Sequence, residues 1–144
     1  MPRYMIIRKA DSKTEAGVLP PTGLLEAMGA YMEEMGKAGI LRGGDGLARS
    51  SEGKRITIPR SGKPRVMDGP FTETKELVAG YALIEVGSLE EAIGWVKKWP
   101  AVDAMDGEVT IEVRRILEEA DFGDAFTPEQ RERERKMRGE SERK

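Results

Sequence analysis

The chain has 144 residues, enough for one domain with its own hydrophobic core, and its net charge of −2 gives no broad electrostatic reason to bind nucleic acid. It contains no cysteine and no histidine, which excludes disulfides, thiol nucleophiles, Ser-His-Asp triads and zinc or copper sites built from nitrogen and sulfur ligands. Any general acid or base must therefore be a carboxylate, a lysine or a tyrosine.

The same composition limits metals, cofactors and membranes as partners. A hard cation held by carboxylates is the one kind of metal site that it still allows, and we expect neither a metal nor a cofactor. No apolar run approaches the ~20 residues that a transmembrane helix needs. The apolar block near the start is too short for a signal peptide. We therefore expect a cytoplasmic protein that does not interact with a membrane.

The first half of the chain predicts a strand, a helix and a second strand. Residues 4–8 are apolar and β-prone, and residues 10–23 are polar and rich in turn formers. An amphipathic helix follows, with Thr22 as its expected N-cap. Its apolar stripe consists of Leu24, Leu25, Met28, Tyr31, Met32 and Met35. The second strand starts at Ile40 and runs into residues 43–46, where three glycines predict a bulge or a close backbone approach.

The second half predicts a hairpin, a long strand, a helix and a last strand. Residues 54–59 and 64–67 read as the two strands of a β-hairpin, and residues 77–86 as the most strongly β-prone strand. Ser88 and Glu91 form a capping box before an amphipathic helix that ends at Pro100. Residues 109–113 alternate between apolar and polar side chains, which is typical of a half-buried strand. The order is that of an α+β, ferredoxin-like βαββαβ domain with an inserted β-hairpin.

The composition changes after Leu117, so we expect a domain of residues 1–117 and a charged tail of residues 118–144. Thr127, Pro128 and Gln130 together predict a helix start. The residues that follow are almost all charged, with i,i+4 pairs of opposite sign such as Glu134 and Arg138. This segment has no apolar face, which predicts a protruding or frayed tail. Nucleic-acid binding by its cationic side chains is the less favoured interpretation.

The loop Asp68-Gly69-Pro70-Phe71, continued by residues 72–76, is the densest group of turn formers and charges in the chain. In one interpretation it is structural, with Asp68 accepting hydrogen bonds from backbone N–H groups of its own turn. In the other it is a site, with Asp68 as the catalytic carboxylate. The ligand-binding side chains would then be Phe71, Lys75, Glu76, Tyr31 and Tyr81.

Residues 66–76, Val-Met-Asp-Gly-Pro-Phe-Thr-Glu-Thr-Lys-Glu, followed by Gly80, Tyr81 and Ile84, resemble the signature of the DGPF-domain branch of the YCII-like family. The resemblance covers about residues 3–117. It implies a bacterial protein whose sheet pairs with that of a second copy, in a dimeric α/β-barrel arrangement with a cleft between sheet and helices. Relatives are suspected of enzyme activity through a His/Asp pair, which cannot be carried over to a chain without histidine.

Three functions remain open from the sequence. The first is a small-molecule site in the cleft of a homodimer, where Asp68 could support a proton-transfer or lyase-like reaction or the site could only bind. The second is a regulatory interaction protein, because the resemblance implies an association with extracytoplasmic-function sigma factors. The third is a structural dimer without a ligand site. The residues do not decide whether the protein is an enzyme.

Overall fold

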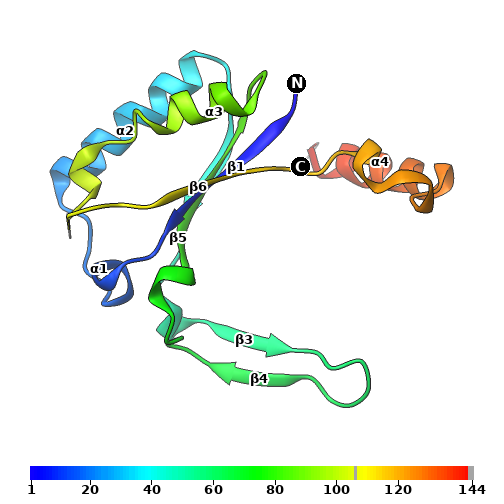
Figure 1. The fold of residues 1–144 in the computed structure, drawn as a ribbon, viewed down its shortest axis with the longest axis horizontal. Coiled ribbons are helices and arrows are strands. Elements are labelled where there is room, and N and C mark those ends of the chain that lie inside the picture. Colours follow the sequence, from blue (N-terminus) through cyan, green and yellow to red (C-terminus); the bar gives the residue numbers. More distant parts are fainter. Residues whose placement is uncertain (106, 143–144) are drawn as a thin grey trace.

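The computed structural model describes residues 1–105 and 107–142, and within them four strands form the main sheet (Figure 1). The strands are β1 (Arg3–Lys9), β2 (Leu41–Gly46), β5 (Val78–Glu85) and β6 (Ile111–Arg115), in the order β2-β5-β1-β6. All three neighbouring pairs are antiparallel. This mixed α+β architecture agrees with the predicted ferredoxin-like fold. The last strand begins and ends two residues later than the predicted range of 109–113.

Helices α2 (Thr22–Lys37) and α3 (Leu89–Val96) lie together on one side of the sheet (Figure 1). They form because apolar side chains recur at helical spacing and pack on the inward positions of the strands. The prediction for the N-cap of α2 was wrong: Pro21 occupies that position without a side-chain hydrogen bond, and Thr22 is the first helical residue. The buried core consists of Tyr4, Ile6, Tyr31, Met35, Ile40, Ala82, Ile84, Val86 and Ala92.

Short helical turns connect these elements. One of them, α1 (Ser12–Glu15), lies in the segment that we expected to be irregular. It forms because Asp11 accepts a hydrogen bond from the backbone N–H of Thr14, while the backbone N–H of Asp11 donates to the Thr14 hydroxyl. The other turns are η1 (Ser50–Glu52), η2 (Thr74–Glu76), η3 (Ala101–Asp103) and η4 (Glu119–Ala125).

The predicted hairpin is confirmed. Strands β3 (Lys54–Thr57) and β4 (Arg65–Asp68) pair with each other in a separate two-stranded sheet. We call residues 54–68 the hairpin arm. It projects from the body on the side of the main sheet opposite α2 and α3 (Figure 1).

The charged tail is helical and also projects from the body. Helix α4 (Pro128–Glu142) starts at the predicted signal, because the Thr127 hydroxyl accepts from the Gln130 N–H and the Thr127 N–H donates to Gln130 Oε1. We call residues 117–142 the helical arm. Neither this helix nor any other within residues 1–105 and 107–142 is long and apolar enough to cross a membrane. The division of the chain at residue 117 stays a prediction, and its last residues, 143–144, lie outside the described part.

Candidate functional site

The sheet lacks side chains at the positions that face α2 near one end of β2 and β5. Gly44 lies opposite Ala82, and Gly46 lies opposite Gly80, so all four belong to the helix-facing side of the sheet. A Cβ atom on Gly44 would lie 2.7 Å from the Tyr81 carbonyl oxygen, which excludes any larger residue there. A Cβ atom on Gly46 would meet nothing within 4 Å. The glycines therefore leave a hollow between sheet and helices, and the predicted bulge is present between Leu41 and Gly43.

This hollow is part of a cavity of about 690 Å³. Its volume lies within the range of small-molecule sites, which is roughly 300–1,000 Å³. Most of the wall is apolar and comes from α2 and the segments on either side of it. The apolar lining includes Leu19, Leu24, Leu25, Met28, Met32, Leu47, Trp99 and Met105. Met28 and Met32 of the predicted apolar stripe thus form part of the pocket wall.

A buried polar cluster at the end of β1 closes one side of the cavity. Arg8 and Asp103 form a two-pronged ion pair, with Nε to Oδ2 at 3.0 Å and a terminal nitrogen to Oδ1 at 2.9 Å. Asp103 also accepts from the Trp99 indole nitrogen at 2.9 Å, and Arg8 contacts the Asp11 carboxylate at 3.1 Å. Arg8 and Asp103 are 8% and 7% exposed. Because Arg8 also donates to the Lys9 carbonyl, the cluster is saturated with internal hydrogen bonds.

Two members of this cluster, Arg8 and Asp11, have shifted pKa values that favour their charged forms. Burial alone would lower the pKa of Arg8, but the hydrogen bond and the charge of Asp103 outweigh it and leave that pKa raised. Burial works against ionisation of Asp11 as well, yet the Thr14 N–H and the Arg8 guanidinium outweigh it and hold the pKa of Asp11 below its usual value. The cluster is therefore a fixed, charged wall and holds no spare proton acceptor.

Tyr81 is the predicted site residue that borders the cavity, but its side chain lies on the face of the sheet opposite Gly80 and Ala82. On that face it sits opposite Asp45 in the β5–β2 register, and its hydroxyl donates to Asp45 Oδ2 at 3.2 Å. The hydrogen bond to Asp45, helped by the carboxylate charge, raises the pKa of Tyr81. Asp45 was not among the predicted site residues.

Asp68 lies at the base of the hairpin arm and not in the cavity wall. Its side chain is 76% exposed and pairs with the Lys54 ammonium, which is its register partner across the hairpin. A catalytic role for Asp68 stays a prediction. Asp68 was also predicted to accept hydrogen bonds from backbone N–H groups of its own turn. Within the described residues its side chain accepts from Lys54 instead.

The rest of the DGPF loop packs against η1. A Cβ atom on Gly69 would lie 1.7 Å from the Ser50 carbonyl oxygen, so only glycine fits. The Phe71 N–H donates to the Ser50 hydroxyl at 3.1 Å, and the Phe71 ring lies 4.0 Å from the Arg55 guanidinium. Ser50 also donates through both its N–H and its hydroxyl to the Glu15 carboxylate. These contacts attach the hairpin arm to the body.

The other predicted ligand-binding residues lie apart from the cavity lining. Tyr31 is 5% exposed in the core, and its hydroxyl donates to the Trp95 carbonyl oxygen at 2.7 Å. Burial, with a smaller effect of Glu34, raises the pKa of Tyr31 to about 12. Lys75 and Glu76 lie in η2, where the Glu76 carbonyl oxygen accepts from Lys9. The structure does not bring the six predicted residues together, and their roles stay predictions.

No group of three or more Asp or Glu side chains that could hold a metal ion is found within residues 1–105 and 107–142. The sequence contained one signal for the cluster that we missed. Arg8 follows Tyr4 and Ile6 at the inward-facing period of a buried strand, and an inward arginine requires a carboxylate partner. No short-range sequence pattern identifies Asp103 as that partner.

Comparison with known proteins supports the family resemblance. The YCII-related domain matches residues 2–120, which confirms the resemblance drawn from the DGPF loop. The chain belongs to the YCII-related domain family. A relative from Rhizobium meliloti (strain 1021), known only as an uncharacterized protein, is 49% identical over 37 residues. That match spans 26% of this chain and 30% of the relative, so the chain covers less than a third of its length.

A solved structure with a related arrangement is 5-chloro-2-hydroxyhydroquinone dehydrochlorinase (TftG) from Burkholderia phenoliruptrix AC1100, in complex with 2,5-dihydroxybenzoquinone. It is 16% identical to this member of the YCII-related family, with a TM-score of 0.45, and the match covers 83% of this chain and 97% of that one. The association with a sigma factor stays a prediction that none of these comparisons bears on.

Proposed function

We propose that this YCII-related protein binds a small, mainly apolar organic molecule in the cavity between α2 and the β2–β5 end of the sheet. The observation that carries the proposal is the 690 Å³ cavity, which includes the hollow left by glycines at helix-facing sheet positions. Tight packing is the rule in protein interiors, so an opening of this size in the main sheet–helix interface is typical of a binding site.

The charges around the cavity support a ligand that is close to neutral. Its ionisable lining contains three cations and four carboxylates, so neither sign dominates. These residues are Arg8, Lys13, Arg49, Asp11, Asp45, Glu52 and Asp103. Asp103 and Asp11 are engaged by Arg8, and Asp45 accepts from Tyr81. The geometry therefore supports binding better than proton transfer, because the buried carboxylates of the wall, Asp103 and Asp11, are already paired with Arg8.

Filling the hollow tests the proposal. Gly46→Leu places a side chain where a Cβ meets no atom within 4 Å, so the fold should persist while the cavity shrinks. Gly29→Leu is the matched control, because Gly29 lies on the exposed side of α2 and its Cβ also meets nothing within 4 Å. A fragment and metabolite library is screened by ligand-observed NMR and thermal shift. Wild type and Gly29→Leu should bind the same compounds, and Gly46→Leu should lose them.

Two further variants make the outcome decisive. If Gly46→Leu unfolds, Met28→Trp narrows the same cavity from the α2 side. Hits that persist at unchanged affinity in a folded cavity-filled variant would show that the ligand binds elsewhere. Asp68→Asn is screened in parallel, because loss of binding or of turnover in that variant would establish the catalytic role predicted for Asp68.

We propose that the binding form is a homodimer. The face of the sheet opposite α2 and α3 carries Met5 paired with Leu83, and Ile7 paired with Tyr81, all only partly buried. Family resemblance implies that this face packs on a second copy. Light scattering should give twice the 16.0 kDa mass of one chain. A mass of one chain at micromolar concentration would refute the dimer without affecting the cavity.

A further inference from the structure

The hairpin arm carries large apolar side chains that are exposed to solvent. Ile56, Ile58, Val66 and Met67 are 59%, 75%, 63% and 51% exposed. Ile56 and Val66 are register partners, so their side chains lie on the same face of the hairpin. A two-stranded hairpin on its own is at best marginally stable in water. The arm therefore presents a surface that is suited to pack against another protein surface.

The hairpin arm is also strongly basic. It contains Lys54, Arg55, Arg60, Lys63 and Arg65, and Asp68 is its one carboxylate. Asp68 pairs with Lys54, whereas Arg60, Lys63 and Arg65 take part in no ion pair among the described residues. The unpaired cations lie at or beside the tip of the arm, so the tip suits a surface with negative charge.

The root of the helical arm, residues 117–126, has the opposite charge and its own exposed apolar groups. It contains four carboxylates, Glu118, Glu119, Asp121 and Asp124, and no Lys or Arg. Leu117 and Phe122 are 56% and 52% exposed, and the Phe122 and Phe126 rings lie 5.4 Å apart.

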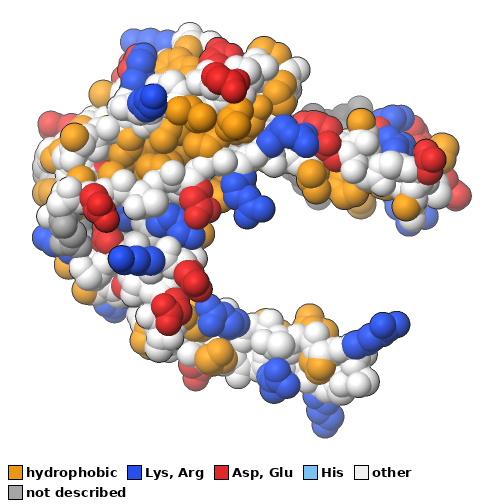
Figure 2. Space-filling model, viewed as in Figure 1, with side chains coloured by type: hydrophobic (Ala, Val, Ile, Leu, Met, Phe, Trp, Pro, Cys, Tyr) orange, Lys and Arg blue, Asp and Glu red, His pale blue; other side chains and the backbone are white. Residues whose placement is uncertain are grey.

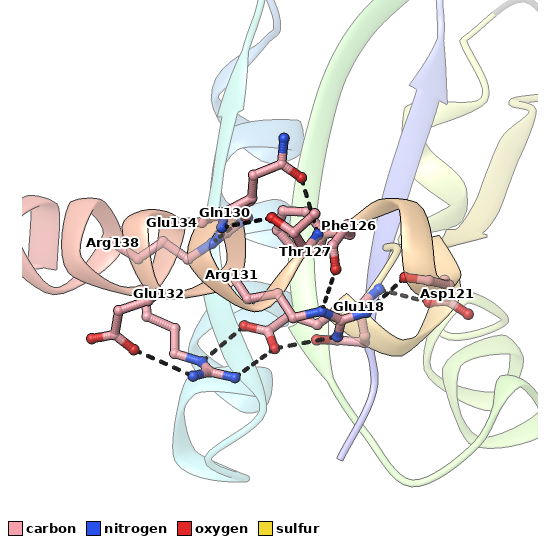
Figure 3. A network of polar contacts seen from close by, with 12 residues as sticks. Glu118, Asp121, Phe126, Thr127, Gln130, Arg131, Glu132, Glu134 and Arg138 are labelled. Atoms are coloured by element: carbon pink, nitrogen blue, oxygen red, sulfur yellow. Dashed lines mark hydrogen bonds and ion pairs between the residues drawn. The ribbon is translucent and has the colours of Figure 1, made fainter.

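Arginines from neighbouring elements hold this root in a fixed shape. Arg115 binds Asp121 with two hydrogen bonds at 2.8 and 2.9 Å, and Arg135 binds Glu119 at 3.0 and 2.9 Å. Figure 3 shows the surrounding network, in which Arg131 donates to the Phe126 carbonyl oxygen at 2.8 Å. Glu118 also lies 3.7 Å from the Arg3 guanidinium, so three of the four carboxylates have arginine partners. Apolar contact would therefore supply most of the docking energy. The charges would mainly select the orientation.

Both arms project on the same side of the main sheet, and Figure 2 shows a hollow between them with hydrophobic side chains on each arm. A second copy facing this sheet can be related by a two-fold axis in two ways. One places each arm beside its own equivalent, which brings the basic hairpins together. In the second arrangement the partner is rotated so that its two arms exchange places. Each hairpin tip then lies beside the partner's helical-arm root. Repulsion between like charges disfavours the first.

We propose that in the homodimer the hairpin tip of each copy docks on residues 117–126 of the other copy, with Ile58 meeting the apolar surface of Leu117 and Phe122. This inference rests on the proposed homodimer and adds the contact that fixes its symmetry. Each copy makes the contact twice, once with each arm, as a two-fold dimer requires. The contact also covers the exposed apolar groups of both arms.

The absence of cysteine from the whole sequence allows a clean cross-linking test. Ser61→Cys marks the hairpin tip and Ala125→Cys marks the helical-arm root; both positions are exposed, and neither is one of the three apolar residues proposed to meet. The two single variants are produced separately and together in one cell with different tags, then treated with a short bis-maleimide cross-linker. We expect a covalent heterodimer in the co-expressed sample and at least tenfold less dimer in either variant alone.

The outcomes separate this inference from the dimer on which it rests. Strong cross-linking of Ser61→Cys alone would show that like arms meet and would overturn the proposed orientation. A two-chain mass by light scattering with no cross-link in any sample would leave the homodimer standing and reject the arm contact. A one-chain mass would reject both.

As a further check, Arg60→Glu combined with Lys63→Glu should reduce the heterodimer yield several-fold, whereas Lys37→Glu on α2 should not change it.

Discussion

The interface between the sheet and its helices is filled at one end and hollow at the other. At the filled end, Ile84 and Val86 are 0% and 1% exposed and pack beneath Ala92 and Met35. At the hollow end, the same face of the sheet carries Gly80 and Gly46. The strands stay paired at both ends, with one register shift between Leu41 and Gly43 and another between Arg8 and Lys9. The difference therefore lies in side-chain volume, and it separates a region that stabilises the fold from one that is available to a ligand.

The two ends also differ in chemistry. The filled end is built from the hydrophobic cluster around Ile84, whereas the hollow end places an ion pair beside the cavity, formed by Arg8 and Asp103. A buried ion pair contributes little net stability but becomes costly when one partner is removed. The following predictions compare the two ends, beginning with the largest expected effect.

Asp103→Ala should cause the largest loss of stability, because it leaves the Arg8 guanidinium buried without its main partner. We expect a decrease of about 3–5 kcal/mol in the free energy of unfolding, measured by urea titration. Glu33→Ala is the control, since it breaks an exposed ion pair with Lys37 and should cost less than about 1 kcal/mol. Equal effects of the two variants would show that the cluster beside the cavity is not buried in solution.

Ile84→Ala probes the filled end. Its side chain is fully buried, and truncation leaves a void that the core cannot close, so stability should fall by about 3 kcal/mol. Ile58→Ala on the hairpin arm should change the stability of the monomer by less than about 0.5 kcal/mol, because Ile58 is 75% exposed. Ligand binding should survive Ile84→Ala. If it were lost in the folded variant, the two ends would not be independent.

Tyr31→Phe probes a core residue that also contacts Trp99 of the cavity wall. It removes the hydrogen bond to the Trp95 carbonyl oxygen and should cost about 1 kcal/mol, while the ring contact with Trp99 at 5.6 Å persists. We expect ligand affinity to stay within twofold of wild type. A larger drop in affinity at unchanged fold would support the ligand-binding role that the sequence suggested for Tyr31.

Lowering the pH should have the smallest effect on the free energy of unfolding. Because the folded-state pKa of Asp11 is lowered, its contribution is fully present above the unfolded value of about 4 and is lost as the pH falls through the lower folded value. The stability difference between wild type and Asp11→Asn should therefore shrink from pH 5 to pH 2.5 in urea titrations. A constant difference over this range would show that Asp11 acts through packing and not through its charge.

Much of the fold could be predicted because its signals are local. Helical spacing in α2, the capping residue Ser88, and the signal of Thr127 with Gln130 each act over a few residues. The glycines of β2 correctly indicated a bulge and a close backbone approach. Their further consequence, a cavity, could not be derived because it depends on which strand lies opposite, and Gly80 is remote in the sequence.

The site residues were harder to predict because their partners are distant. Arg8 and Asp103 are 95 residues apart in the chain, and only the order of strands brings them together. Asp68 was conspicuous in the sequence for its neighbours, Gly69 and Pro70. Its side-chain direction, however, is set by the hairpin register that places Lys54 opposite it.

Ser50 gives the loop and the cavity a mechanical connection. Its hydroxyl accepts from the Phe71 N–H at the base of the hairpin arm and also contacts Glu15 of α1. Its neighbours Arg49 and Glu52 line the cavity. One short turn thus connects the base of the hairpin arm to the cavity rim. The shortest chain of contacts between the hairpin arm and the pocket therefore runs through this turn and not through the core.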